Sequence, residues 1–590
     1  MQGIDFIQGD VSVTTHGGHD DLLGAGLGLV GLKGPLAPFG DPQQPTALEL
    51  RRRAIQTSWK GIADLGPLGG YGTVYGTVPD VPGREYQAFA KIPGARAPHR
   101  VLLQVPDGFD KAHRCLVVTA SSGSRGIYGA IALAGAWGLP RGCAVAYTDK
   151  GTGSGYFDFS DDSGVALDGR RAKRGTAMLE FEPSAAKGEG IAIKHAHSGD
   201  NPEADWGRHV LQAAQFGLAM LDRAFPDQAP FTPQNTKIIA TGLSNGGGAV
   251  LQAAGIDDQH MLAGVVALEP NVHTPGHGRA LYDYMTEAAK WLPCALLDAR
   301  FASTPFARDA LGAPHAAWIS RCASLHAQGK LKASTLEGQA AEAYERLHSA
   351  GWSDQAMATG ASSTALDLWR VIGAGYASAY LRCSADDMPC GYRYEATSAN
   401  GKPGTADDAT RTADDATRAS WWADASGIPP GNGVGLFGGI DESVDPLLAG
   451  IECLRRLWTD DDANARALHA SVQALSARLP RKSVPLWVVH GADDGLLPTA
   501  FTSEPYVAWL RAEGRRPLYW KVPHAQHFDA FLALPGFGDK HLPLLPYGYA
   551  ALDRLWAHLF QDQPWPDDLA APVTTPRGAG ALQPSMLGLH

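Results

Sequence analysis

The segment GLSNG at residues 242–246 is the part of the sequence that points most clearly to chemistry. It matches the pattern G-x-S-x-G and lies between an apolar strand-like run at 236–244 and a helix-like stretch, NGGGAVLQAAG. In this context the strand turns sharply into the helix, and the hydroxyl of Ser244 stands above the edge of a sheet. Small flanking residues let the neighbouring backbones approach. The pattern therefore favours a nucleophilic serine over a structural turn.

A serine hydroxyl needs a base to take its proton and an acid to orient that base. In hydrolases built around this turn, the acid and then the base follow the nucleophile along the chain. The strand-like run 484–491 leads into a loop with Asp493 and Asp494, of which we favour Asp494 as the acid. The segment PHAQHFDAF follows the last predicted strand, and we favour its His527 as the base.

Four other residues compete with this assignment. Glu269, after the strand-like run 263–270, is a second candidate acid, and His524 is a second candidate base. Asp493 is expected to be a turn or helix-capping residue. His490 stands at a strand end and is expected to form hydrogen bonds with the backbone.

The oxyanion that forms during acyl transfer needs hydrogen-bond donors. One expected donor is the backbone N–H of Asn245, the residue after the nucleophile. The second is expected from the small, glycine-rich loop 121–126, with Ser122 and Gly123 as candidates. A simple surface turn is the other interpretation of this loop.

The elements that must position these residues alternate between strands and helices. Apolar strand-like runs occur at 99–105, 115–122, 143–149, 236–244, 263–270, 484–491 and 517–523. A helical stripe of apolar residues covers 203–225. Fully apolar strands that alternate with helices are typical of a parallel sheet covered on both faces. Together with the serine turn, they predict an α/β-hydrolase fold.

A helix-rich stretch interrupts the predicted sheet. We therefore predict that residues 1–273 and 481–590 form the hydrolase core and that 274–480 form a large, mainly helical inserted cap. Trp421 and Trp422 in this stretch could line an apolar acyl pocket, although core packing explains them equally well. TADDATR occurs twice in tandem, at 405–418, which is too few copies for a solenoid and favours a duplicated surface turn.

Composition excludes several classes of protein. The 590 residues are 44% hydrophobic and 19% charged, which is an ordinary globular balance. A net charge of −11 disfavours nucleic acids and anionic membrane surfaces as partners. No apolar stretch reaches the ~18 to 20 residues of a membrane span. We expect no metal and no cofactor, because no histidine, cysteine or acidic cluster has a convincing ligand spacing. The oligomeric state is left open.

The seven cysteines bear on the compartment. Cys115 and Cys143 lie in or beside apolar strand-like runs and are expected to be buried thiols. The candidate disulfides of an oxidising compartment are Cys294 with Cys322 and Cys383 with Cys390, although spacing alone does not decide. The apolar stretch 22–32 follows acidic residues rather than a basic flank and does not resemble a secretory signal. A mature chain after signal removal would look the same, so we expect a secreted or periplasmic protein in that case and a cytoplasmic one otherwise.

Three segments, TGLSNGGGAVLQAAG, DDLLGAGLGLVGL and HAQHFDAF, together resemble the D-(−)-3-hydroxybutyrate oligomer hydrolases over nearly the whole chain. The resemblance implies a serine esterase with Ser244 as nucleophile that cleaves short 3-hydroxybutyrate oligomers, including the dimer. It also implies a role in polyhydroxybutyrate breakdown, often with secretion, and a small oligoester as the partner.

Two alternatives to this function remain open. The stretch GCAVAYTDKGTG is similar to tannases and feruloyl esterases, which implies an aromatic-ester or polyester-derived-ester hydrolase. The other is a hydrolase-fold binding protein without catalysis, against which the complete order of serine, acid and histidine argues.

Overall fold

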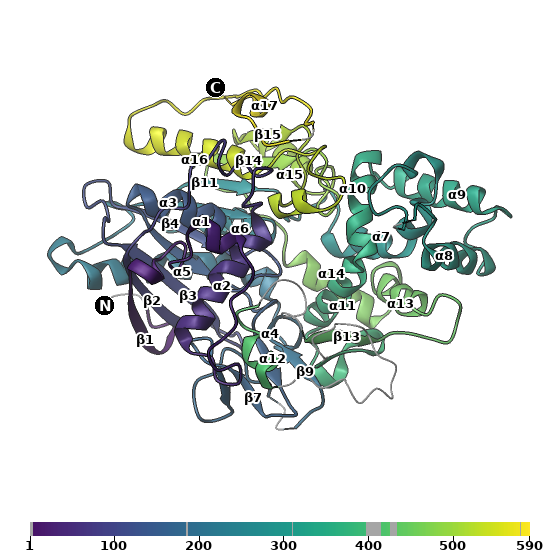
Figure 1. The fold of residues 1–590 in the computed structure, drawn as a ribbon, viewed down its shortest axis with the longest axis horizontal. Helices are drawn as coiled ribbons and strands as arrows, with labels where there is room; N and C mark the ends of the chain where they lie inside the picture. The colour runs from purple at the N-terminus through teal and green to yellow at the C-terminus, as the bar shows by residue number, and fades with distance from the viewer. Residues whose placement is uncertain are drawn as a thin grey trace.

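The computed structural model describes residues 4–184, 187–309, 311–396, 415–424, 433–578 and 580–589. Within these residues the main sheet has nine strands in the order β1-β2-β3-β5-β4-β10-β11-β14-β15 (Figure 1). The strands are β1 (Ile7–His16), β2 (Gly83–Ala90), β3 (His99–Pro106), β4 (Cys115–Ala120), β5 (Ala144–Thr148), β10 (Lys237–Leu243), β11 (Leu262–Leu268), β14 (Leu486–Gly491) and β15 (Leu518–Val522). The first three strands pair antiparallel, and the run from β5 to β15 is parallel.

Helices cover both faces of this sheet. Successive residues of β4 point to opposite sides, as the pleat requires. Leu116 and Val118 pack with α5 (Pro202–Ala224) and α6 (Asn245–Ile256), whereas Cys115 and Val117 belong to the core that contains α2 (Ala47–Ile62) and α16 (Leu545–Phe560). Every residue of β4 and β14 is buried. This confirms the predicted α/β-hydrolase fold.

Parallel register places the functional loops at one edge. In the paired strands, Leu243 of β10 lies opposite Leu268 of β11, and Gly491 of β14 lies opposite Val522 of β15. The loops that follow these strands therefore leave the same edge, formed by the carboxyl ends of the strands. Ligand sites of open α/β sheets lie outside this edge.

A long excursion separates β11 from β14. It contains α7 (Leu281–Ala295), α8 (Ala316–Ala327), α9 (Leu336–Ser349), α10 (Asp354–Ala365), α11 (Leu368–Leu381), α12 (Asp415–Ser420), α13 (Leu448–Thr459), α14 (Ala463–Gln473) and the antiparallel pair β12 (Tyr392–Ala396) and β13 (Val434–Gly438). Most of these helices lie beside the sheet, at the right of Figure 1. We call residues 269–485 the inserted segment. The predicted boundaries of core and cap stay predictions.

A shorter excursion follows β5. It forms a four-stranded sheet, β8-β7-β6-β9, and ends in the short helix α4 (Lys194–His197). Its strands are β6 (Tyr156–Asp158), β7 (Ser163–Val165), β8 (Arg171–Lys173) and β9 (Ile191–Ile193). Helix α4 contacts α11, so the two excursions meet. Among the described residues no helix is both long and apolar enough to cross a membrane.

Most of the tandem repeat lies outside the described residues. The described end of its second copy, 415–418, belongs to α12 rather than to a turn. Arg418 in this helix forms an ion pair with Asp158 of β6, at 2.6 Å. For these four residues the predicted surface turn is wrong, because they continue into the helix that leads to the two buried tryptophans.

The disulfides correct two predictions about the cysteines. Cys115 and Cys143 are bonded to each other and are not thiols. Their neighbours, Leu116 and Ala144, are paired in adjacent parallel strands, which brings the two cysteine Cα atoms to 4.7 Å. This separation lies within the range that a disulfide spans.

The cysteines of the inserted segment form two further bridges. The predicted pair Cys294–Cys322 is present and joins α7 to α8. The predicted pair Cys383–Cys390 is wrong, because Cys390 is bonded to Cys453 of α13 and Cys383 is a buried thiol. The partner lies 63 positions away in sequence, and spacing gave no indication of it.

Candidate active site

Ser244 occupies the turn between β10 and α6. Its backbone has φ 56° and ψ −125°, a conformation that costs energy for a residue with a side chain. Backbone hydrogen bonds hold it there: the Ser244 N–H donates to the Leu268 carbonyl at 3.0 Å, and its own carbonyl accepts from Gly248 and Asn271 at 3.1 and 3.0 Å. The surrounding strands and helix thus impose the strained turn.

The flanking glycines make room for this turn. A Cβ atom on Gly242 would collide with the carbonyl of Gly246, and one on Gly246 would collide with the carbonyl of Ala120 at the end of β4. The turn therefore touches the start of the loop 121–126. Both glycines of the G-x-S-x-G pattern are required by close backbone packing.

A chain of hydrogen bonds joins the side chains of Ser244, His527 and Asp494. The Ser244 Oγ lies 3.1 Å from His527 Nε2, and His527 Nδ1 lies 2.7 Å from Asp494 Oδ2. All three side chains are buried. The geometry is that of a nucleophile, a base and an orienting acid.

The acid is fixed from several directions. Asp494 Oδ1 accepts hydrogen bonds from the backbone N–H groups of Leu496 and Leu497, both at 2.8 Å. Burial alone would raise the pKa of the Asp494 carboxyl, but the imidazoles of His527 and His490 hold it well below its ordinary value. The carboxylate is therefore ionised at neutral pH and faces the imidazole.

His490 differs from its prediction. Its ring does not bond the backbone: Nε2 lies 3.1 Å from Asp494 Oδ2, and Nδ1 lies 2.7 Å from Ser503 Oγ. The loop after β14 turns back and brings Asp494, four positions later, over the histidine ring. Sequence reasoning missed this second partner of the acid, although the separation of four positions was visible.

The competing candidates lie elsewhere. The Asp493 carboxylate is 3.6 Å from the ring of His541 rather than at His527. His524 has φ 60°, and its carbonyl accepts from the N–H of Leu542. Glu269 is buried, and burial, together with the nearby carboxylate of Asp494, raises its pKa well above the ordinary value. Glu269 is not hydrogen-bonded to His527.

The loop 121–126 lies against the residue after the nucleophile. A Cβ atom on Gly123 would be 3.1 Å from both Cγ and Nδ2 of Asn245. In the described part of the chain, no hydrogen-bond acceptor is paired with the backbone N–H of Ser122, Gly123 or Asn245. For Asn245 this follows from its place at the start of α6, since the first N–H groups of a helix lack intrahelical partners. Gly123 of this loop therefore lies next to Asn245, and the oxyanion donors stay a prediction.

The two tryptophans predicted to line a pocket do not contact the hydrogen-bonded triad of Ser244, His527 and Asp494. Trp421 packs edge-on against Tyr156, with ring centroids 4.8 Å apart, and the ring of Trp422 lies 5.2 Å from the guanidinium carbon of Arg100. Both are buried. Among the described residues, no recorded contact joins either ring to Ser244, Asp494 or His527.

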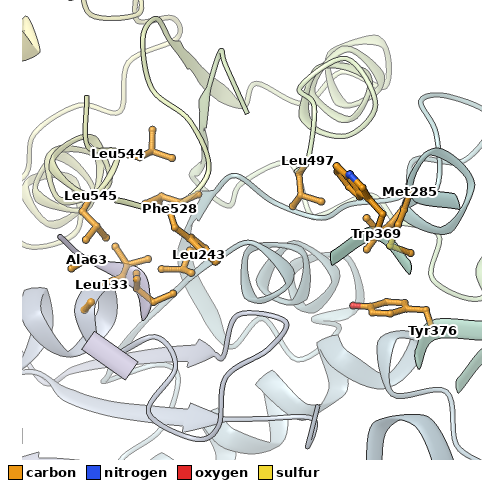
Figure 2. Close-up of a cluster of buried hydrophobic side chains, with 14 of the residues drawn as sticks. Ala63, Leu133, Leu243, Met285, Trp369, Tyr376, Leu497, Phe528, Leu544 and Leu545 are labelled. Carbon is orange, nitrogen blue, oxygen red and sulfur yellow. The ribbon is translucent and has the colours of Figure 1, made fainter. Parts of the chain in front are cut away.

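Other apolar side chains flank the triad. Figure 2 shows one group around Leu243 and Phe528, the neighbours of Ser244 and His527 in sequence. We call the residues 492–498, which follow β14 and include Asp494, the acid loop. A second group, on the other side of the view, contains Leu497 from the acid loop and three side chains of the inserted segment: Met285, Trp369 and Tyr376. The inserted segment therefore contributes part of the apolar surroundings of the site.

The acid loop packs directly on the inserted segment. A Cβ atom on Gly495 would lie 2.6 Å from the carbonyl oxygen of Ala356 and would collide with the backbone nitrogen of Gly360, both in α10. Only glycine fits at position 495. The residue after Asp494 is thus in backbone contact with a helix outside the sheet.

Tyr376 is a residue near the site that sequence reasoning missed. Its hydroxyl accepts a hydrogen bond from Asn245 Nδ2 at 2.5 Å. Nothing in the local sequence of α11 distinguishes this tyrosine from the others in the chain. The contact arises only when the inserted segment folds back onto the sheet.

Comparisons with known proteins agree with the sequence-based resemblance. The model of the 3HB-oligomer hydrolase family matches residues 4–587. The D-(−)-3-hydroxybutyrate oligomer hydrolase of Paracidovorax citrulli is 39% identical over 634 aligned residues, which cover 95% of this chain and 88% of that protein. The hydrolase of the same description from Cupriavidus metallidurans is 37% identical and covers 97% and 87%.

Solved structures resemble the chain more weakly. Tannin acyl hydrolase from Aspergillus niger is 13% identical, with a TM-score of 0.37 and coverage of 83% of this chain and 80% of that one. Feruloyl esterase B from Aspergillus oryzae is 11% identical, with a TM-score of 0.34 and coverage of 89% and 81%. Likeness at this level does not distinguish one ester substrate from another.

Proposed function

The chain belongs to the 3HB-oligomer hydrolase family and is a carboxylic-ester hydrolase, and we propose that it cleaves short 3-hydroxybutyrate oligomers with Ser244 as nucleophile, His527 as base and Asp494 as orienting acid. The observation that carries this proposal is the line from Ser244 Oγ through the His527 ring to Asp494, with distances of 3.1 and 2.7 Å. The substrate class comes from the relatives at 35–39% identity.

In the proposed reaction His527 Nε2 takes the proton of Ser244 as Oγ attacks the carbonyl carbon of an ester bond. The carbonyl oxygen becomes an oxyanion that accepts hydrogen bonds from the backbone N–H of Asn245 and from the loop that contains Ser122 and Gly123. Asp494 stabilises the imidazolium and keeps its orientation. When the intermediate collapses, His527 returns the proton to the leaving oxygen, which becomes the hydroxyl of the departing hydroxybutyrate unit.

The second half repeats these steps with water. His527 removes a proton from a water molecule, whose oxygen attacks the acyl carbon bound to Ser244. The second oxyanion uses the same donors, and its collapse returns the proton from His527 to Oγ. The products are 3-hydroxybutyrate, or a shortened oligomer, and the free enzyme.

The test is release of 3-hydroxybutyrate from the dimer and trimer by the wild type and by Ser244→Ala. We expect kcat to fall by about 10⁴-fold or more, because the residual rate then rests on binding and oxyanion donors alone. Ser324→Ala, which alters a serine in α8, is the control and should keep the wild-type rate. Wild-type turnover in Ser244→Ala, or failure of a fluorophosphonate to label Ser244 in folded protein, would contradict the mechanism.

A substrate panel tests the specificity separately. Dimer and trimer of 3-hydroxybutyrate should give higher kcat/KM than gallate, ferulate or terephthalate esters. The opposite order, with Ser244→Ala inactive on all of them, would keep the mechanism and reassign the substrate to aromatic esters.

We also propose that the protein works in an oxidising compartment, as a secreted or periplasmic enzyme. Three disulfides, Cys115–Cys143, Cys294–Cys322 and Cys390–Cys453, support this, since such bonds persist mainly outside the reducing cytoplasm. Thiol alkylation in denaturant without reductant, followed by mass spectrometry of protein from the native host, should modify only Cys383. Alkylation of all seven cysteines would contradict the proposal.

A further inference from the structure

The side chain of Asn245 is held from three sides. Its Nδ2 donates to the Tyr376 hydroxyl at 2.5 Å, and its Oδ1 accepts from Asn271 Nδ2 at 3.2 Å. Gly123 packs against the same amide group. One side chain thus touches α11 of the inserted segment, the loop after β11 and the proposed oxyanion loop. Its backbone N–H is the proposed oxyanion donor.

A buried ion pair stands behind Tyr376. The Lys150 ammonium donates to the Tyr376 hydroxyl at 3.1 Å and forms an ion pair with Glu203. The Glu203 carboxylate also bonds His195 Nε2, at 2.7 Å. Lys150, Glu203 and Tyr376 are each no more than 3% exposed. A buried charge is costly without its partner, so this group resists rearrangement.

The Tyr376 hydroxyl is therefore a fixed acceptor. Burial, with the neighbouring Glu203 carboxylate, raises the pKa of Tyr376 well above its ordinary value, and the hydroxyl stays neutral. It accepts from a charged ammonium on one side, which is the stronger kind of hydrogen bond, and from the Asn245 amide on the other. The ion pair thus sets where the hydroxyl lies, and the hydroxyl sets where Asn245 lies.

We propose that Tyr376 is a positioning residue for ester hydrolysis, which holds Asn245 so that its backbone N–H faces the developing oxyanion. The inference rests on the proposed function. Stabilisation by an oxyanion donor depends steeply on its distance from the charge, and loss of one donor costs about 10²- to 10³-fold in kcat. A donor that is displaced rather than lost should cost less than this.

The experiment compares Tyr376→Phe with Tyr282→Phe. Tyr282 is also a buried tyrosine of the inserted segment, and its hydroxyl donates to the Leu454 carbonyl at 2.8 Å. Both changes remove one buried hydroxyl and should lower Tm, Tyr376→Phe by more because its hydroxyl accepts two hydrogen bonds. Tyr376→Phe alone should lower kcat on the 3-hydroxybutyrate dimer, by about 10- to 100-fold, with KM within about twofold.

A double-mutant cycle asks whether Tyr376 acts through Asn245. Asn245→Ala removes the amide and keeps the backbone N–H. If Tyr376 acts through this amide, Tyr376→Phe combined with Asn245→Ala should be no slower than Asn245→Ala alone. Asn271→Ala releases the same amide from its other side and should lower kcat in the same direction, which gives a second route if Tyr376→Phe folds poorly.

Equal kcat in Tyr376→Phe and Tyr282→Phe would overturn the inference, as would losses that multiply in the double variant. Either result with an inactive Ser244→Ala leaves the proposed function intact. An active Ser244→Ala would instead remove the proposed function, and the positioning role with it.

Discussion

The sheet and the inserted segment hold the site in different ways. The sheet and the loops at its edge, including the first residues after β11, fix the site through the backbone: the peptide groups of Ser244 bond Leu268, Gly248 and Asn271, and Asp494 is held by two N–H groups of its own loop. The helices of the inserted segment reach the site through side chains and packing, which include the Tyr376 hydroxyl of α11 and the contact of α10 with Gly495. The difference indicates that strand register supplies the chemistry, while packing of the inserted segment adjusts its geometry.

Asp494→Asn tests most directly whether the residues at the edge of the sheet supply the chemistry. We expect kcat to fall about 10⁴-fold with the fold intact, because asparagine holds the imidazole in the wrong tautomer. Asp493→Asn is the matched control, since that neighbouring carboxylate lies near His541 instead, and it should keep near-normal kcat. The measurements are kcat on the 3-hydroxybutyrate dimer and circular dichroism, which reports whether the fold is intact. A similar loss in both variants would mean that the loop, not the acid, is what matters.

The contact between the two regions is tested by Gly495→Ala. The new Cβ would collide with α10, so the acid loop or the helix must move, and we expect kcat to fall about 10- to 100-fold with a lower Tm. Gly360→Ala lies on the helix side of the same contact, where the nearest atom to a new Cβ is Leu292 Cδ2 at 3.3 Å.

Gly360→Ala should therefore keep its activity, and its Tm should not fall. Alanine is favoured over glycine inside a helix by about 1 kcal/mol, and a leucine side chain can shift slightly. Identical behaviour of Gly495→Ala and Gly360→Ala would argue against a rigid contact between the acid loop and α10.

The smallest effect on activity is expected at Glu85 of β2, in the antiparallel part of the sheet. Its carboxylate accepts from Arg51 Nε at 3.0 Å, from Gln104 at 2.9 Å and from the Tyr128 hydroxyl at 2.9 Å. Burial opposes ionisation, but Arg51 lowers the pKa of Glu85 to about 2. A lowered pKa stabilises the folded state above the unfolded value, near 4.5, and this stabilisation is lost as the pH falls towards 2.

The free energy of unfolding of the wild type should thus decrease by about 3 kcal/mol relative to Glu85→Gln between pH 5 and pH 2, at about 1.4 kcal/mol per pKa unit. Glu345→Gln, an exposed change in α9 of the inserted segment, should show no such change. Denaturant titrations at several pH values measure both. If the difference in the free energy of unfolding between the wild type and Glu85→Gln stayed constant from pH 5 to pH 2, the lowered pKa of Glu85 would be refuted. Neither variant should alter kcat at neutral pH.

Sequence reasoning located what chain order and local pattern encode. The turn around Ser244, and the loops with Asp494 and His527, each follow a recognisable strand, so their convergence at one sheet edge could be predicted. Tyr376 could not, because its contact depends on how the inserted segment folds onto the sheet. The bond between Cys390 and Cys453 was hidden for the same reason. His490 was misread because only the backbone of its strand was considered.

The order of the residues along the chain has a consequence for biosynthesis. Ser244 precedes His527 by 283 positions, and Asp494 also comes only after the inserted segment. During translation the turn can form on β10 while neither of its proposed partners has left the ribosome, so under the proposed mechanism the serine is inert until the segment after residue 485 is made. Because β14 and β15 add to one edge of strands already present, activity begins only when that late piece docks.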